Sequence, residues 1–438
     1  MLIDFSFSNF RSFRDEQAFS MTRDEKFMDP DDSEQSPITA IYGANASGKS
    51  NFLKALRTMS SMVANSYSQG NADSIIYREP FLLQKDPFAQ PSSFFLEFIA
   101  NDGLKYRYWF RYDNQQILEE ELTFFKDING RFSTHSSLLF SRSADNGVKF
   151  GTSFKGPRTQ VRKTIELRPN ALLLSAAAAA GIESIQPVFS FFQRGIAYYE
   201  ANAFDQELPL LLDEFKKETP LSKNLATLIR YADFGISDVK NVPINVPPEV
   251  WSRVKEEMHK RLGIDEGKVE ETFNVKNASQ LQFTHTGDSS SAGFSPDDES
   301  RGTVAALSFF SLAIRQLSSQ SVTLIDEIDT SLHPTLVAEL VKLYADSETN
   351  PHGSQLIFTT HDVSLINQSG SARRLLQPDQ IWLVEKNTDG ASELFPVTDL
   401  GIRKGENIGK NYLNGVYGAT PKPDFHTAFA QIVNGNES

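Results

Sequence analysis

The sequence contains no cysteine among its 438 residues. This absence excludes disulfide bonds, thiolate metal sites and cysteine nucleophiles, and it fits a reducing compartment. No apolar run reaches the roughly 18 residues that a membrane-spanning helix needs, because the longest candidate, residues 171–181, is short and ends at a glycine. The N-terminal residues MLIDF also lack the basic segment of a signal peptide. We therefore expect a cytoplasmic protein with no membrane partner.

Positive charge is also scarce, since 43 Lys and Arg residues face 56 Asp and Glu residues, which gives a net charge of −13. This balance argues against a broad surface that coats nucleic acid, although a local basic patch remains compatible with it. DNA is thus a possible partner that the charge does not favour. The hydrophobic fraction of 39% lies in the ordinary globular range, and the 34 phenylalanines predict an aromatic-rich core.

One stretch organises the chain: an apolar, β-favouring run at residues 38–42, then GANASGKS at residues 43–50, then a helical pattern. The spacing G-x-x-x-x-G-K-S between a strand and a helix is typical of a phosphate-binding loop. Its backbone N–H groups and the helix N-terminus favour phosphate, Lys49 supplies a charge for the β- and γ-phosphates, and the Ser50 hydroxyl is a Mg²⁺ ligand. The residues expected to bind ATP here are Gly43, Asn45, Ala46, Ser47, Gly48, Lys49, Ser50 and Asn51.

A second apolar run, SVTLIDE at residues 321–327, ends in two carboxylates. We expect Asp326 to lie beside the Mg²⁺ and Glu327 to take a proton from the attacking water. A third run, QLIFTTHD at residues 355–362, delivers His361 at the carboxyl end of a strand, where parallel sheets bind ligands. His361 is therefore a candidate sensor of the γ-phosphate.

The segment DESRGT at residues 298–303 precedes a helical pattern that leads into the carboxylate run. A Ser-x-Gly-Thr turn at a helix N-terminus is a potential anion site. By composition alone, an ordinary N-cap is the better explanation. The position of the turn favours the other interpretation, in which Ser300, Gly302 and Thr303 bind the γ-phosphate of a nucleotide held by a second subunit.

The rest of the amino-acid sequence predicts a mixed α/β protein. Residues 2–21 read as two strands, and residues 93–142 read as an antiparallel meander of four strands separated by Asn/Asp/Gly turns. Residues 170–261 read mostly as helices, and strands then alternate with helices from residue 304, which favours a parallel core. We predict four segments: 1–84 with the phosphate loop, 85–169 as the meander, 170–280 as a helical insertion for partner contact, and 281–438 with the carboxylates.

Taken together, these motifs resemble the ATP-binding-cassette (ABC) class of ATPases, in the soluble branch with the SMC, RecF and double-strand-break-repair proteins. Lys49 matches the Walker A lysine, Asp326 and Glu327 the Walker B pair, residues 300–303 the signature turn, Asp329 the D-loop and His361 the switch histidine. The resemblance implies an ABC-ATPase head: a mixed sheet with a parallel P-loop core, an antiparallel β-subdomain and a helical insertion. It also implies ATP and Mg²⁺ as ligands. For the Q-loop glutamine, Gln84 is the first candidate and Gln186 the second.

The segments SNFRSF, IYGANASGKSN, ESRGT, LIDEIDTSLHP, FTTHD and YLNGVYGA resemble the stand-alone ATP-binding proteins of bacterial phage-defence and abortive-infection systems. The ATPase halves of OLD-type proteins, AriA of PARIS and PtuA of Septu are similar. The resemblance implies a homo-oligomer, at least a dimer, that hydrolyses ATP and controls a separate effector protein. Because we find no Toprim or HNH-like pattern, we expect the nuclease or toxin activity to come from that partner.

Three other functions remain open. A DNA-repair or DNA-end-binding ATPase belongs to the same branch, but the acidic charge and the lack of long heptad repeats disfavour it. The motor subunit of a transporter is disfavoured because the turn lacks Leu-Ser-Gly-Gly-Gln and the insertion is large. In the third, the protein hydrolyses ATP slowly or not at all, and ATP is a structural ligand.

Overall fold

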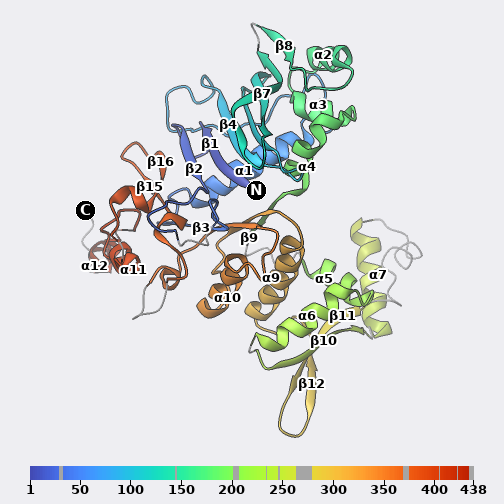
Figure 1. The fold of residues 1–438 in the computed structure, drawn as a ribbon. Helices are drawn as coiled ribbons and strands as arrows, with labels where there is room; N and C mark the ends of the chain where they lie inside the picture. Colours follow the sequence, from blue (N-terminus) through green and yellow to red (C-terminus); the bar gives the residue numbers. More distant parts are fainter. Residues whose placement is uncertain are drawn as a thin grey trace. The chain divides into compact units, whose positions relative to one another are not determined.

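The structure is a computed structural model that describes residues 1–28, 33–143, 146–200, 207–232, 234–244, 247–262, 279–367, 374–403, 405–421 and 423–433. The chain forms two compact units (Figure 1). Unit 1 comprises Met1–Glu200, Gln316–Asp329 and Val337–Ser438, and unit 2 comprises Ala201–Arg315 and Thr330–Leu336. The predicted division at residues 84, 169 and 280 stays a prediction.

Unit 1 contains a seven-stranded antiparallel sheet in the order β2-β1-β4-β5-β6-β7-β8. The predicted N-terminal strands and the predicted meander are confirmed, and they form one sheet because β1 pairs with β4. Along β5, Tyr106, Tyr108, Phe110 and Tyr112 are buried and alternate with more exposed residues, as expected of a sheet with one covered face. The bounds are β1 Leu2–Ser8, β2 Gln17–Ser20, β4 Ser92–Ile99, β5 Lys105–Tyr112, β6 Ile117–Asp127, β7 Phe132–Ser143 and β8 Gly147–Phe150.

A second sheet of unit 1 has six strands in the order β16-β15-β3-β14-β13-β9. Its five strands from β15 to β9 are parallel, and β16 is antiparallel to β15. Every residue of β3, β13 and β14 is buried, which is typical of central parallel strands covered on both faces. The bounds are β3 Ile38–Gly43, β9 Ile196–Glu200, β13 Val322–Asp326, β14 Gln355–Thr359, β15 Ile381–Lys386 and β16 Ser392–Pro396.

Helix α1, Lys49–Asn65, lies between the two sheets of unit 1 (Figure 1). Its buried stripe includes Phe52, Leu53, Leu56, Met59 and Val63, which follow the three- and four-residue spacing of an amphipathic helix. These side chains share one core with phenylalanines of β1 and β4, with α3 and α4, and with β13 and β14. The bounds of the other helices are α2 Arg158–Leu167, α3 Leu173–Ala179, α4 Gln186–Arg194, α10 Pro334–Ala345, which enters unit 1 at residue 337, α11 Ile408–Leu413 and α12 Phe425–Val433.

Unit 2 has its own core and a three-stranded antiparallel sheet in the order β10-β11-β12. Leu211, Leu225, Val239 and Phe283 are buried where helices α5 and α6 meet this sheet. The bounds are α5 Leu208–Lys216, α6 Pro220–Tyr231, β10 Ile236–Pro243, α7 Pro248–Leu262, β11 Ser279–Thr286, β12 Ser291–Phe294 and α9 Arg301–Leu317, whose last two residues belong to unit 1.

The predicted mixed fold is confirmed: a parallel P-loop core, an antiparallel sheet and a mainly helical insertion. The prediction of helices over residues 170–261 was incomplete, since β9 and β10 lie within that range. The side chains of these two strands do not alternate cleanly between buried and exposed, so neither strand gives a period-2 signal. Within the described residues, no helix is long and apolar enough to cross a membrane.

Candidate nucleotide site

The phosphate-binding loop connects the end of β3 at Gly43 to the start of α1 at Lys49. Its glycines are required by close packing. A Cβ atom on Gly43 would lie 2.4 Å from the carbonyl oxygen of Val384, and one on Gly48 would lie 2.5 Å from the Ser392 hydroxyl. Gly48 also has a φ of 122°, which strains any side chain. The loop tip at Asn45 and Ala46 is exposed, as a ligand-binding loop requires.

The ammonium group of Lys49 is buried within this loop. Its Nζ donates hydrogen bonds to the carbonyl oxygens of Gly43 at 2.9 Å and Ala44 at 3.2 Å, and it lies 3.1 Å from Nε2 of His361. Burial lowers the pKa of Lys49, against the opposing effect of nearby carboxylates. The lysine charge is thus oriented by the loop backbone rather than by an ion pair.

His361 follows β14, as the sequence predicted for a residue at the carboxyl edge of the parallel sheet. Burial lowers the pKa of its imidazole, and the charge of Lys49 lowers it further. Because Lys49 has only donors to offer, Nε2 of His361 accepts and the ring proton resides on Nδ1. The backbone N–H of His361 donates to both oxygens of Asp329, at 3.4 and 3.3 Å. The switch-histidine candidate His361 therefore contacts both Lys49 and the D-loop candidate Asp329.

The predicted Mg²⁺ ligands Ser50 and Asp326 also lie together. The Ser50 hydroxyl donates to Oδ1 of Asp326 at 2.9 Å, and Oγ1 of Thr359 donates to the same oxygen at 2.6 Å. Thr359 in turn accepts from the backbone N–H of Glu327 at 2.7 Å. Thr359 is a site residue that the sequence interpretation missed, although it stands two positions before His361.

This hydroxyl–carboxylate pair fits Mg²⁺. The ion keeps several waters and takes one or two protein oxygens plus phosphate oxygens in such sites, so Ser50 and Asp326 suffice as its protein ligands. Among the described residues, no cluster of three His, Asp or Glu side chains could hold a metal without that help. The site thus matches a cation that arrives with a phosphate.

Glu327 adopts a left-handed backbone conformation with φ of 55°, which is uncommon for glutamate. Its N–H is fixed by Thr359, and its side chain is exposed. The turn therefore directs the carboxylate away from the buried strand that carries it. This is the placement expected of a group that must reach water.

Asn51 and the loop residue Ser47 have partners from distant segments. The Asn51 amide donates to the Ser12 hydroxyl at 2.9 Å, and the carbonyl oxygen of Ser47 accepts from Ser392. The Ser47 hydroxyl is buried and has no hydrogen-bond partner among the described residues. The N-terminal SNFRSF segment and β16 thus enclose the phosphate loop.

The C-terminal motif YLNGVYGA also packs beside the loop. The Tyr412 ring lies 5.7 Å from the Tyr42 ring, and a hydrogen bond to the Gly43 backbone partly offsets the burial that raises the pKa of Tyr412. The N–H of Ala419 donates to Oε2 of Glu385 on β15 at 2.8 Å, and a Cβ on Gly418 would lie 2.4 Å from that oxygen. This contact explains the glycine of the motif.

Glu200 at the end of β9 is a second residue that the sequence interpretation missed. It is the register partner of Asp326 on the adjacent parallel strand, and paired residues of parallel strands share a face. Its carboxylate lies 3.9 Å from Lys54, one helical turn beyond Ser50 on α1. Ser50–Asp326 and Lys54–Glu200 therefore form successive contacts between α1 and the sheet edge.

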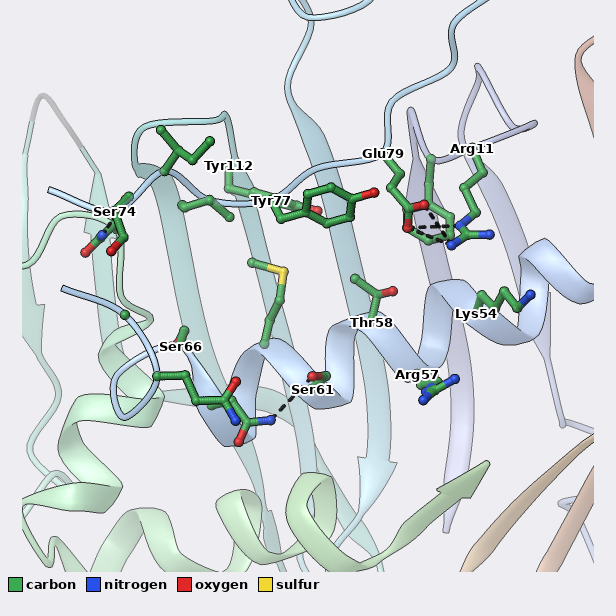
Figure 2. Close-up of a pocket in the computed structure, with 18 of the residues that line it drawn as sticks. Arg11, Lys54, Arg57, Thr58, Ser61, Ser66, Ser74, Tyr77, Glu79 and Tyr112 are labelled. Atoms are coloured by element: carbon green, nitrogen blue, oxygen red, sulfur yellow. Dashed lines mark hydrogen bonds and ion pairs between the residues drawn. The ribbon is translucent and has the colours of Figure 1, made fainter. Parts of the chain in front are cut away.

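Lys54 and Glu200 also line a groove of about 710 Å³ that runs along the polar side of α1 (Figure 2). Thr58 and Ser61 lie on the helix at its floor, and Arg11 pairs with Glu79 at one end, with a shortest distance of 2.7 Å. None of the residues 43–50 lines this groove. It adjoins the phosphate loop at Lys54 without including it.

The structure does not bring the two Q-loop candidates to the carboxylates. The Gln84 amide lies 3.5 Å from Oδ1 of Asn9. The amide of Gln186, the first residue of α4, donates to the carbonyl oxygen of Ala178 in α3. Strand β13, which carries Asp326, lies between β14 and β9, and β9 ends in Glu200. All five residues of β9 are partly exposed, so the strand shows no alternation of buried and exposed residues by which the sequence could identify it.

The predicted signature turn lies in unit 2, where Ser300 precedes α9. Its hydroxyl accepts from the N–H of Thr303 at 3.1 Å and contacts the Thr303 hydroxyl at 2.9 Å, so it acts as an N-cap. A Cβ on Gly302 would lie 2.7 Å from the carbonyl oxygen of Ser331, which explains the glycine. Binding of an anion by Ser300, Gly302 and Thr303 stays a prediction.

Several solved structures are distantly similar to this chain. The chain resembles, at 15% identity and a TM-score of 0.44, a crystal structure of the SMC head bound to the C-winged helix domain of ScpA, with 92% of this chain and 99% of that chain covered. It resembles the recombination mediator protein RecF at 14% identity and a TM-score of 0.34, with 90% and 98% covered. These values are too low to bear on function. No curated protein matches the sequence.

A family profile does match. Residues 38–367 fit the family described as "AAA domain, putative AbiEii toxin, Type IV TA system". The matched range runs from β3 of the phosphate loop to just beyond His361, which includes both halves of the candidate site. Because it covers well over half of the 438 residues, the protein belongs to this AAA domain family.

Proposed function

We propose that this protein is a Mg²⁺-dependent ATPase of the ABC type, which assembles around ATP and controls a partner effector in anti-phage defence. One observation carries the catalytic part of the proposal. Lys49 and His361 lie 3.1 Å apart, and Ser50, Asp326 and Thr359 join in one hydrogen-bond chain beside them. Phosphate binding, cation binding and a candidate general base thus meet at one sheet edge.

Each residue has a distinct task in this proposal. The loop N–H groups and Lys49 hold the β- and γ-phosphates, while Ser50 and Asp326 hold Mg²⁺. The ion supplies neutralisation of the charge that develops on the phosphates. Glu327 orients the attacking water and accepts its proton, and His361 contacts the γ-phosphate through its neutral imidazole. Glu200 adds a second carboxylate beside Asp326.

The proposal extends to an oligomer. The ATP held by one copy would meet the Ser300–Thr303 turn of a second copy, where the N-terminus of α9 offers a positive end to an anion. Asp329 would lie at the same junction, since it already bonds the backbone of His361. A dimer with two ATP molecules is the smallest assembly that satisfies both copies.

The defence role rests on the family and on the resemblance to AriA, PtuA and OLD-type proteins. The family description names a toxin and a type IV TA system, which links such domains to growth control or defence. A cytoplasmic location, and a nuclease or toxin as the separate partner, belong to the same proposal. The alternative is a DNA-repair or DNA-end-binding ATPase of the RecF/SMC type, and the AAA domain fits it equally well.

Two variants test the catalytic proposal. We expect Lys49→Ala to lower affinity for a fluorescent ATP analogue at least tenfold, because the buried ammonium is the charge that faces the phosphates. We expect Glu327→Gln to bind ATP normally, to lose phosphate release, and to accumulate as an ATP-bound dimer in light scattering.

The matched control is Lys342→Ala, because this exposed lysine lies on α10 and pairs with Glu339. Equal nucleotide affinity in Lys49→Ala and the wild type would refute the site. Binding without any phosphate release in the wild type would instead identify ATP as a structural ligand.

A further inference from the structure

A histidine–glutamate pair lies directly beside the signature turn in unit 2. Nε2 of His285 is 2.7 Å from Oε1 of Glu299, the residue before Ser300. Only 7% of the Glu299 side chain is exposed, whereas 32% of the His285 side chain is. A carboxylate removed from water to this extent needs a hydrogen-bond partner, and His285 provides one.

His285 is held by the sheet of unit 2 rather than by the turn. It lies on β11, the central strand, and pairs in register with Ile236 of β10 and Ala292 of β12. The Phe294 ring packs edge-on against its imidazole at a centroid distance of 5.1 Å. The backbone position of His285 is therefore set by pairing with both neighbouring strands, and its imidazole contacts Phe294 of β12.

The turn itself is locally ordered on both sides of Glu299. The Asp298 carboxylate accepts hydrogen bonds from the hydroxyl and the N–H of Ser295, at 2.7 and 3.2 Å, and Ser300 caps α9. The contact between Glu299 and His285 joins this ordered turn to the three-stranded sheet. A change in this contact therefore alters the position of the turn.

We propose that His285 is a positioning residue for the signature turn, and that through Glu299 it transmits the state of the three-stranded sheet to Ser300 and Gly302. The inference rests on the proposed function, in which this turn meets the γ-phosphate of a second copy. Without the imidazole, the Glu299 carboxylate turns toward water and rotates the adjoining backbone of Ser300. Nucleotide binding by Lys49 on the same copy does not depend on this contact.

The experiment uses the full chain with Glu327→Gln as parent, so that ATP-bound dimers persist. We expect His285→Ala to keep the affinity for a fluorescent ATP analogue within twofold and to weaken ATP-dependent dimerisation at least tenfold. His285→Gln, whose amide can still donate to Glu299, restores most of the dimerisation. The control is His352→Ala, an exposed histidine of unit 1.

Amide hydrogen exchange at residues 298–304 gives a second readout that does not require a dimer. We expect faster exchange in His285→Ala and near-normal exchange in His285→Gln. Unchanged exchange at these amides in His285→Ala overturns the inference, and so does dimerisation equal to that of the parent. If the parent itself fails to dimerise with ATP, the proposed function fails, and exchange alone decides the role of His285.

Discussion

Burial lowers the pKa of two neighbouring residues of the nucleotide site, Lys49 and His361. His361 lies beside the Lys49 ammonium and is partly withdrawn from water, and both effects lower the pKa of its imidazole. A neutral ring that accepts from Lys49 holds the ammonium in the loop without adding charge of its own. The sequence could place both residues near phosphate, but not predict that they contact each other.

The lowered pKa makes stability depend on pH in a defined direction. In the folded protein His361 binds fewer protons than it does in the unfolded chain. Its contribution to the free energy of unfolding is therefore present above about pH 6.5 and is lost as the pH falls below that value. We expect the wild type to lose stability relative to His361→Asn as the pH is lowered from 7.5 to 5.5. Urea unfolding at both pH values measures this, with His352→Asn as the control. A difference that is constant with pH would contradict it.

At the scale of elements, one buried carboxylate fastens helix α3 to the antiparallel sheet. Glu120 of β6 accepts from the N–H groups of Leu173 and Leu174 at 2.7 and 2.9 Å, and from the Tyr108 hydroxyl at 2.9 Å. It also pairs with the buried Arg142 at 3.0 Å. Burial lowers the pKa of Arg142, and the Glu120 charge opposes that effect.

Removing this carboxylate leaves the buried Arg142 cation without its charged partner, although Nη2 of Arg142 still donates to the carbonyl oxygen of Ala171. It also leaves the N–H groups of Leu173 and Leu174 without their acceptor. We expect Glu120→Ala to lower the free energy of unfolding by about 3–5 kcal/mol, and Glu120→Gln to lower it less because the amide oxygen still accepts. The adjacent Glu121→Ala should stay within about 0.5 kcal/mol of the wild type. Guanidinium unfolding gives all three values. Equal effects at positions 120 and 121 would exclude the capping role.

Strand β9 gives the second element-scale prediction. Its register places Glu200 beside Asp326, so its charge adds to the negative potential that favours Mg²⁺. We expect Glu200→Ala to raise the Mg²⁺ concentration for half-maximal ATPase activity by about tenfold, because the loss of an outer partner of a metal site commonly weakens metal binding by that factor. Glu200→Gln should raise it less, and the exposed Glu348→Ala should leave it unchanged. An unaltered Mg²⁺ requirement in Glu200→Ala would remove this residue from the site.

At the scale of the whole molecule, each unit is assembled from separate stretches of sequence. Unit 1 takes the strands of its parallel sheet from residues 38–43, 196–200 and 322–326 and from segments between residues 355 and 396. Unit 2 comes mainly from residues 201–315. The central strands of the parallel sheet were predictable from their apolar runs. The joining of β1 to β4 was not, because strand pairing at that sequence distance leaves no local signal.

The net charge of −13 makes a prediction for the molecule as a whole. We expect the ATPase rate to be the same with and without duplex DNA between 50 and 200 mM salt, because an acidic surface gains little from counterion release. A DNA-end-binding ATPase would instead be stimulated at low salt and lose that stimulation steeply as salt rises. Such a salt-dependent stimulation would select the repair function over the defence function.

The sequence by itself determined what depends on local pattern. The spacing of Gly43, Gly48 and Lys49, and the apolar runs that end in Asp326 and His361, predict a phosphate and cation site, because each run carries its chemical groups at a strand end. The buried face of α1 follows from its period in the same way. These features need no knowledge of distant contacts.

Only the tertiary structure decided which distant groups complete the site. Thr359 and Glu200 reach Asp326 through strand pairing, and Tyr412 reaches the phosphate loop from the C-terminal segment. The contact between His285 and Glu299 depends on where β11 places His285 relative to the turn before α9. Such contacts depend on the relative placement of elements, which short-range periodicity does not encode.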